Sequence, residues 1–318
     1  MRILVIGAAG FLGSHLVPTL LAEGHEVTVC EVVHPDGAVR LGGVMARIHY
    51  LWKSVLDITV ADILGFDWII DLAAVTDVPL AIKSPRWCWN LNTDGVLAVL
   101  EALRALSTDD KLKRDVPGLI FISTESVYGR VPKEKQPITE DQPFNPVNVY
   151  GASKAAAELL IKAYAIEFGI KTLVLRSTSM FGEYGRPKQV IPIFITQAFA
   201  GKDITIEGDG SQSRDFSYVR NTVHAILLAM KHDQTGVWNL GCGSECTIRE
   251  MAELIIRLTN SSSKIVFKPW RAGERGVQLP MNIGKARREL GYEPPFELEQ
   301  GLRRTIDWFR AGVQLCSV

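Results

Sequence analysis

The chain has 318 residues, 47% of them apolar, which is enough for one large hydrophobic core or two smaller ones. Its 35 acidic and 35 basic side chains balance without a block of like charge, which argues against a nucleic-acid or membrane partner and favours a small molecule. The five cysteines lack the repeated close pairs of a zinc site or a disulfide framework, so we expect no metal and a reduced, cytoplasmic protein.

Short apolar runs alternate with segments of helical periodicity through the first 180 residues. The expected strands are Arg2–Ile6, Val27–Cys30, Trp68–Asp71, Leu119–Ser123 and Thr172–Arg176. This alternation predicts an α/β fold with a doubly wound parallel sheet. The clearest helix runs from Gly151 to Phe168, where Gly169 is placed to end it in a left-handed conformation.

A glycine-rich turn follows the first expected strand. The segment Gly7-Ala8-Ala9-Gly10-Phe11-Leu12-Gly13 lies between that strand and a helical stretch. Glycines there allow a tight turn and the close approach of a pyrophosphate, which the free N–H groups of the helix start can bind. This order predicts a Rossmann-type dinucleotide site. Glu31, after the second strand, would bind the adenosine ribose and repel a 2′-phosphate, which predicts NAD; the alternative is a structural turn and a solvated glutamate.

After Met180 the pattern loosens into short elements joined by glycine-rich turns. We therefore expect residues 1–180 to form the NAD-binding domain, to which later segments return. Residues 181–318 would form mainly a smaller, mixed α/β substrate-binding domain. The proline-rich loop Val131–Val149 is too long for a simple connection, and we expect it to border the active site.

The expected chemical centre combines the start of the strongest helix with the end of a strand. Tyr150 and Lys154 are four residues apart and so lie on one helix face. A neighbouring lysine favours the phenolate, so we expect Lys154 to lower the pKa of Tyr150 and make it a base. Thr124 ends a strand at the carboxyl edge of the sheet, where its hydroxyl could bind the same substrate oxygen.

Seven motifs occur in order along nearly the whole chain. They are Gly7-x-x-Gly10-x-x-Gly13, Leu72-Ala73-Ala74, Asn92-Thr93-Asp94-Gly95, Ser123-Thr124-Glu125-Ser126-Val127-Tyr128-Gly129, Tyr150-x-x-x-Lys154, Gly208-Asp209-Gly210-Ser211-Gln212-Ser213-Arg214-Asp215-Phe216 and Arg271-Ala272-Gly273-Glu274. This set resembles the extended short-chain dehydrogenase/reductase family, in the branch of NAD-dependent nucleotide-sugar epimerases and dehydratases that includes the UDP-glucose 4-epimerases.

The resemblance implies a role for each matching position. The cofactor would be bound by Gly7, Gly10, Phe11, Leu12, Gly13, Glu31, Asp57, Ile58, Leu72, Ala73, Ala74, Val75, Asn92, Ile122, Tyr150 and Lys154. The sugar nucleotide would be bound by Thr76, Thr124, Ser177, Thr178, Ser179, Arg214 and Arg271. The two arginines would hold the diphosphate, because a planar guanidinium matches phosphate oxygens better than an ammonium does.

The resemblance also bears on the reaction, for which Thr124, Tyr150, Lys154 and, as a further candidate, Glu125 are the expected catalytic residues. The family's 4-epimerases oxidise the sugar at C4 and return hydride to the other face. Its 4,6-dehydratases usually carry a glutamate where this chain has Ser126, so we expect an epimerase. Dehydration stays open because Glu125 stands where many dehydratases have an aspartate acid. Keto-sugar reduction and a non-enzymatic role as an NAD-binding scaffold stay open as well.

Two further expectations concern the substrate and the assembly. Ser179 stands where the family usually has asparagine, which implies a roomier sugar pocket, and uridine is the default among several nucleotide bases. Relatives often form homodimers through helices equivalent to residues 85–106 and 150–168. The apolar run Trp87-Cys88-Trp89 fits such an interface or a buried core equally well, and we expect a homodimer.

Overall fold

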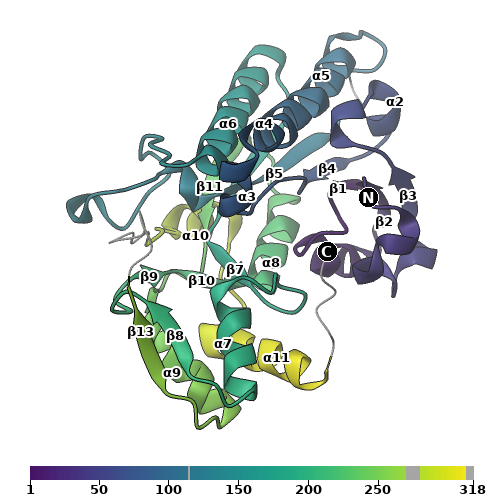
Figure 1. Cartoon of the computed structure of the whole chain (residues 1–318). Coiled ribbons are helices and arrows are strands. Elements are labelled where there is room, and N and C mark those ends of the chain that lie inside the picture. Colours follow the sequence, from purple (N-terminus) through teal and green to yellow (C-terminus); the bar gives the residue numbers. More distant parts are fainter. Residues whose placement is uncertain (114, 270–279, 313–318) are drawn as a thin grey trace.

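The computed structural model describes residues 1–113, 115–269 and 280–312 (Figure 1). At its centre is a parallel sheet of seven strands in the order β11-β6-β5-β4-β1-β2-β3. The strands are β1 (Arg2–Ile6), β2 (Glu26–Glu31), β3 (His49–Trp52), β4 (Trp68–Asp71), β5 (Gly118–Thr124), β6 (Thr172–Ser177) and β11 (Gly236–Leu240). The doubly wound parallel sheet expected from the sequence is confirmed.

Strand β1 shows why its residues form a central strand. Ile3 and Val5 belong to one buried apolar cluster, and Leu4 and Ile6 belong to another. Because neighbouring side chains of a strand point to opposite faces, a strand covered on both sides must be apolar at every position. This explains the continuous apolar run in the sequence.

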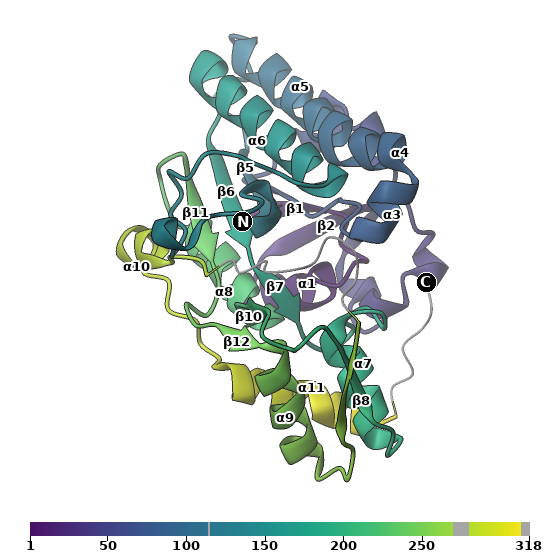
Figure 2. The ribbon, with the colours of Figure 1, turned by 60° about the vertical axis from the view of Figure 1, so that its left-hand side comes forward.

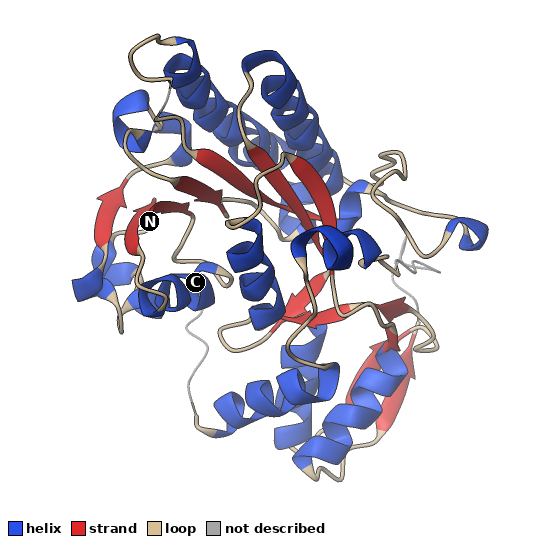
Figure 3. Cartoon of the chain, turned by 180° about the vertical axis from the view of Figure 1, so that it is seen from behind, coloured by secondary structure: helices blue, strands red, loops and turns tan. Residues whose placement is uncertain are grey.

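Helices cover both faces of the sheet. The helices of the described chain, some beside the sheet and some beyond it, are α1 (Gly13–Ala22), α2 (Val60–Ile63), α3 (Val78–Lys83), α4 (Pro85–Trp89), α5 (Gly95–Thr108), α6 (Val149–Phe168), α7 (Val190–Phe199), α8 (Val219–Ala229), α9 (Ile248–Thr259), α10 (Gly284–Leu290) and α11 (Leu298–Arg310). Helices α5 and α6 pack on one face, and α1 and α8 on the other (Figure 3). None of the described helices is long and apolar enough to cross a membrane.

The later part of the chain forms a lobe beneath the sheet in the view of Figure 1, with α7, α9, α11 and a pair of strands. Three short strand pairs occur there and at its junction with the sheet: β7 (Ser179–Phe181) with β10 (Phe216–Tyr218), β8 (Ile204–Glu207) with β13 (Ile265–Lys268), and β9 (Ser213–Arg214) with β12 (Cys246–Thr247). Helix α9 begins with a capping box, in which Thr247 Oγ1 accepts from Glu250 N at 3.1 Å and Glu250 Oε2 accepts from Thr247 N at 2.8 Å.

Helix α6 follows the sequence expectation closely. It starts at Val149, because Asn148 Oδ1 accepts a hydrogen bond from Gly151 N at 2.8 Å and so satisfies one free donor of the first turn. It ends before Gly169, which has a φ of 66°, the left-handed conformation that its position predicted. The loop before the helix therefore fixes where Tyr150 and Lys154 lie.

Candidate active site

A cleft of about 320 Å³ opens at the carboxyl edge of the sheet. The expected site residues that line it are Gly7, Gly10, Phe11, Leu12, Gly13, Leu72, Ala74, Thr76, Ile122, Thr124, Glu125, Tyr150, Lys154, Ser177, Thr178 and Ser179. These residues follow β1, β4, β5 and β6 or begin α1 and α6. The gap between β1 and β4 is where the strand order reverses, the usual ligand position in an open α/β sheet.

Several expected residues lie outside this cleft, and some residues that line it were not expected. Glu31, Asp57, Ile58, Ala73, Val75, Asn92 and Arg214 are not among its lining residues, and Arg271 falls outside the described part of the chain. The unexpected lining residues are Val78, Ser123, Ser126, Met180, Arg186 and Gln189. The loop 131–149, expected to border the active site, contributes no residue to the cleft. Asn148 in this loop caps the start of α6.

A larger hollow, of about 730 Å³, lies at the opposite edge of the sheet. Its lining includes Arg2, Glu26 and His49, at the amino ends of β1, β2 and β3. It contains none of the expected site residues. Because ligands of open parallel sheets bind at the carboxyl ends of the strands, the smaller cleft is the candidate site.

The three glycines of the first loop serve different purposes. Gly7 has a φ of 76°, and a Cβ there would lie 2.7 Å from Ala73 N. A Cβ at Gly13 would lie 2.1 Å from Ala8 O, so this glycine allows helix and loop to pack closely. A Cβ at Gly10, which lines the cleft, would lie 3.3 Å from Gly7 O, closer than an ordinary van der Waals contact. The loop therefore has the shape that a pyrophosphate requires.

Glu31 ties this loop to the end of β2. Its Oε2 accepts a hydrogen bond from Ala9 N at 3.0 Å, and its Oε1 accepts one from Val32 N at 2.8 Å. The carboxylate thus lies beside the glycine loop, where the adenosine ribose of a dinucleotide would be bound. Asp57, which is exposed, and Ile58, which is buried, follow a turn beyond β3, the strand next to β2.

Asn92 holds the loop after β4 from behind the cleft. It is fully buried in a π-helical segment, Asn90–Asp94, between α4 and α5. Its Oδ1 accepts from Val75 N at 2.7 Å, and its Nδ2 donates to Val75 O at 3.1 Å and to Ser153 Oγ at 2.9 Å. Asn92 therefore joins the β4 loop to the first turn of α6. A π-helical bulge at a functional site is a recurring arrangement.

Thr124, Tyr150 and Lys154 all line the cleft. Thr124 ends β5, and its Oγ1 accepts from Ser126 N at 3.2 Å. Burial raises the pKa of the Tyr150 phenol, and the Thr124 hydroxyl is the leading group that opposes this rise. Tyr150 and Lys154 are 9% and 2% exposed, so the groups that could react are shielded from bulk water. A hydroxyl, a phenol and an ammonium that line the same cleft can exchange a proton with a bound alcohol.

Burial shifts the pKa values of both helix residues. It raises the pKa of Tyr150 to about 12, and the leading groups that oppose this rise are Thr124 and Arg186 rather than Lys154, which the sequence favoured. Burial also lowers the pKa of Lys154 to about 8, against the effect of the carboxylates of Asp71 and Glu158. The Lys154 ammonium lies over the Phe121 ring, 3.7 Å from its centroid, a contact that favours its charged form.

A buried ion pair supports the site from the side of α6. Glu158 is hydrogen-bonded by Ser123 Oγ and pairs with Arg176, whose Nη2 lies 2.7 Å from Glu158 Oε2. Arg176 Nη1 also donates to Tyr128 Oη at 2.6 Å. These contacts join α6 to β5 and β6. A buried ion pair of this kind requires its full set of hydrogen bonds, so the elements that carry Thr124 and Tyr150 are held together rigidly.

Glu125, the neighbour of Thr124, is a buried acid with an unused oxygen. It is 7% exposed; its Oε1 accepts from Ser179 Oγ at 3.3 Å, and its Oε2 has no hydrogen-bond partner among the described residues. Burial raises the pKa of Glu125 to about 7, Arg214 opposes the rise and Asp215 adds to it. The hydroxyl of Thr178 also lacks a partner within the described chain. Buried polar atoms left without partners indicate a polar ligand.

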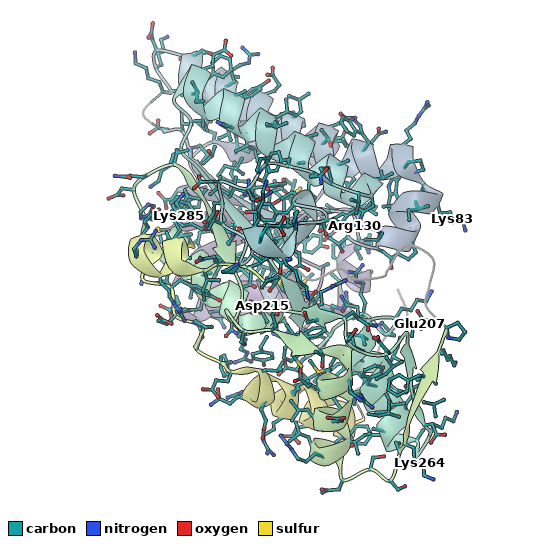
Figure 4. All side chains as sticks on the ribbon, turned by 90° about the vertical axis from the view of Figure 1, so that its left-hand side faces the viewer. Lys83, Arg130, Glu207, Asp215, Lys264 and Lys285 are labelled. Atoms are coloured by element: carbon teal, nitrogen blue, oxygen red, sulfur yellow. The ribbon has the colours of Figure 1, made fainter. Side chains whose placement is uncertain are left out.

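A second cavity, of about 310 Å³, shares Ser179 with the cleft. Lys188, Gln212 and Arg214 line it, and Gln212 Oε1 is another buried atom without a partner among the described residues. Buried polar atoms without partners among the described residues therefore occur in both the cleft and this cavity, and the cationic side chains of Lys188 and Arg214 line the cavity. Asp215, labelled in Figure 4, follows Arg214 and accepts hydrogen bonds from the N–H groups that follow β11.

Comparisons with known proteins identify the family of this chain. The model of the NAD dependent epimerase/dehydratase family matches residues 3–241. A dTDP-glucose 4,6-dehydratase of Streptomyces niveus is 31% identical, over 98% of this chain and 93% of that protein. The structure of a Thermotoga maritima UDP-glucose 4-epimerase with UDP-glucose has a TM-score of 0.88 and 30% identity, covering 99% of this chain and 100% of that one.

Another solved structure bears on the cofactor. It is a UDP-glucuronic acid 4-epimerase of Bacillus cereus in complex with UDP-glucuronic acid and NAD, with a TM-score of 0.85, 28% identity, and coverage of 98% of this chain and 99% of that one. In the present chain the glycine loop that lines the cleft and the carboxylate of Glu31 fit a dinucleotide. The resemblance drawn from the seven motifs is confirmed. The chain belongs to the NAD dependent epimerase/dehydratase family, a branch of the extended short-chain dehydrogenases/reductases, and its cofactor is NAD.

Proposed function

We propose that this protein converts a nucleotide-diphosphate sugar into its C4 epimer through a transient 4-keto sugar, with a UDP-sugar as substrate. The observation that carries the proposal is that Thr124, Tyr150 and Lys154 line the same cleft as the glycine loop. The similarity to a UDP-glucose 4-epimerase over nearly the full length supports it. Nucleotide-sugar chemistry is common to all three relatives described above.

In this proposal Tyr150 accepts the proton of the sugar 4-hydroxyl and later returns it, while Thr124 hydrogen-bonds the same oxygen. Bound NAD supplies a positively charged hydride acceptor. Lys154 holds the cofactor's ribose and contributes positive charge to the cleft. The side chains at Ser177, Thr178 and Ser179 are small, which supports a pocket with room for the ketone to present its other face.

The remaining contacts follow the positions of the elements. We assign the cofactor's pyrophosphate to the loop that carries Phe11 and Leu12, and its adenine to the space near Asp57 and Ile58. Arg214, in the second cavity, would hold the substrate diphosphate together with Arg271. Residues 1–180, with β11 returning to their sheet, would bind NAD, and the lobe formed by the later residues would bind the sugar nucleotide.

A second candidate reaction is 4,6-dehydration, and Glu125 is the observation that favours it. A buried carboxyl with a pKa raised to about 7 is suited to donate a proton to a leaving hydroxyl. The next residue, Ser126, offers only a hydroxyl, whose oxygen lies 3.3 Å from Thr124 Oγ1. Dehydration needs both an acid and a base besides the tyrosine. Glu125 supplies one carboxyl and Ser126 supplies none, so we rank dehydration behind epimerisation.

The deciding experiment incubates the purified protein and NAD with a panel of UDP- and dTDP-sugars and identifies each product by chromatography and mass spectrometry. We expect an isomer of unchanged mass. A product lighter by one water would replace the proposal with dehydration and make Glu125 its acid. The absence of any conversion, with NAD still bound, would instead favour a scaffold that does not turn over sugar.

We also propose that the protein is a homodimer paired through α4 and α6, which lie side by side (Figure 2). Trp87 and Trp89 on α4 are 51% and 43% exposed. Leu159 and Ile166 on α6 are 56% and 75% exposed. Large exposed apolar side chains on adjacent helices are typical of an interface.

A further inference from the structure

We propose that Glu125 makes the sugar end of the cleft selective for a neutral hexose over a hexuronate. This inference rests on the proposed function, since it assumes that a nucleotide sugar binds in the cleft. Solved relatives include one 4-epimerase in complex with UDP-glucose and one in complex with UDP-glucuronic acid. The family fold therefore accommodates both kinds of sugar, and the choice in this chain must depend on its own side chains.

The position of Glu125 places it next to the group that differs between these sugars. In a hexopyranose, the carbon beside C4 carries either a hydroxymethyl group or a carboxylate. Thr124 and Tyr150 are the residues assigned to the 4-hydroxyl, and Glu125 directly follows Thr124 in the turn Glu125–Val127. A group attached beside C4 therefore lies within reach of the Glu125 side chain.

The hydrogen-bonding capacity that the cleft leaves unused matches a hydroxyl. Glu125 Oε2 and Thr178 Oγ1 are buried, line the cleft and have no partner among the described residues. A hydroxymethyl group can donate to the carboxylate oxygen and accept from the threonine hydroxyl. A sugar carboxylate has no proton to donate, so it would leave Glu125 Oε2 unsatisfied in a dry site.

The charges around Glu125 also favour a neutral hexose over a hexuronate. The groups that act on it are Arg214, which favours its ionised form, and Asp215, which disfavours it; Tyr150 is the neighbouring phenol. In the proposed complex the substrate diphosphate takes up the positive charge of Arg214. A hexuronate would then bring a second carboxylate beside Glu125, with Asp215 nearby, and two like charges in a buried site repel each other strongly.

Binding, rather than turnover, gives the sharpest test. We would measure by calorimetry the Kd of the full-length protein with bound NAD for UDP, UDP-glucose and UDP-glucuronic acid at pH 8.5. The pKa of Glu125 is about 7, so its carboxyl is ionised at that pH. We expect UDP-glucose to bind at least about tenfold more tightly than UDP-glucuronic acid. Glu125→Gln, which keeps the shape and removes the charge, should bring the two affinities to within about threefold.

The matched control is Glu134→Gln, which removes the same charge from an exposed residue of the loop before α6 and should leave both affinities unchanged. Equal affinities in the unchanged protein would overturn the inference while leaving the proposed function intact. So would a ratio that Glu125→Gln does not alter, provided that the variant still binds NAD. If UDP and both sugars fail to bind, the proposed function itself fails and the inference falls with it.

Discussion

Burial acts in one direction on the ionisable side chains of the cleft, because it favours the uncharged form of each. The pKa of Tyr150 is raised to about 12, that of Glu125 is raised to about 7, and that of Lys154 is lowered to about 8. A phenol with such a pKa holds its proton at neutral pH. In the proposed reaction, the positive charge of bound NAD would favour the phenolate.

The hydroxyl of Tyr150 can be tested by itself. Tyr150→Phe removes only that group, so sugar conversion should fall at least about 100-fold because proton transfer is lost, while the Kd for NAD changes little. The control is Tyr164→Phe on the same helix, where the lost hydroxyl bonds Glu101 away from the cleft and activity should be retained. Stopped-assay rates and calorimetry measure the two effects. Turnover above a few per cent in Tyr150→Phe would remove the tyrosine from its role as base.

At the scale of elements, the cofactor site depends on how β1, the glycine loop and β2 are joined. Glu31 at the end of β2 accepts hydrogen bonds both from Ala9 in the loop and from its own following residues. We therefore assign two roles to this carboxylate. It holds the loop in shape, and we propose that its charge disfavours a cofactor with an additional phosphate on the ribose.

Two substitutions at Glu31 separate these roles. Glu31→Ala removes the acceptor and the charge, so affinity for NAD should fall about tenfold or more as the loop loosens. Glu31→Gln keeps an acceptor for Ala9 N but removes the charge, so NAD should bind nearly as before and NADP should gain affinity. Calorimetric Kd values for both cofactors test this. An unchanged ratio of NADP to NAD affinity in both variants would show that Glu31 does not contact the ribose.

The sequence predicts the central elements and not the edges, for a physical reason. Strands such as β4 are buried at every position and give a continuous apolar run. The edge strand β3 has exposed and half-buried residues, so His49–Trp52 carries no such signal, and it was missed together with β11. In the site, the loop and helix motifs identify Gly7, Thr124 and Tyr150. Arg186 was missed because it comes from a loop without periodicity and reaches the cleft only through the tertiary fold.

At the scale of the whole molecule, one question from the sequence concerns residues 87–100. Their apolar side chains fitted an interface and a buried core equally well. Cys88, Val96 and Leu100 are buried in the core, whereas Trp87 and Trp89 are exposed. The segment thus has both a core face and an outer face. The proposed dimer would cover these exposed side chains of α4 together with the exposed Leu159 and Ile166 of α6, the helix that α4 contacts.

Light scattering tests the assembly. The chain has a mass of 35.1 kDa, and we expect twice that value for the unchanged protein in solution. The double change Leu159→Glu and Ile166→Glu should yield the single-chain mass, because burying two carboxylates in an apolar interface is costly. Val39→Glu, at an apolar side chain that is 57% exposed elsewhere, should leave the larger mass unaltered. A single-chain mass for the unchanged protein would end the dimer proposal.

The place of β11 in the sheet has a consequence for synthesis on the ribosome. β6 is buried along its whole length, but its outer neighbour is the late strand β11, Gly236–Leu240. A growing chain that has reached Ser177 therefore has an unpaired, apolar strand edge until Leu240 has emerged. Such edges are sites of wrong pairing between nascent chains. The order in which the ribosome delivers the strands thus leaves one edge of the sheet open to wrong pairing during that interval of translation.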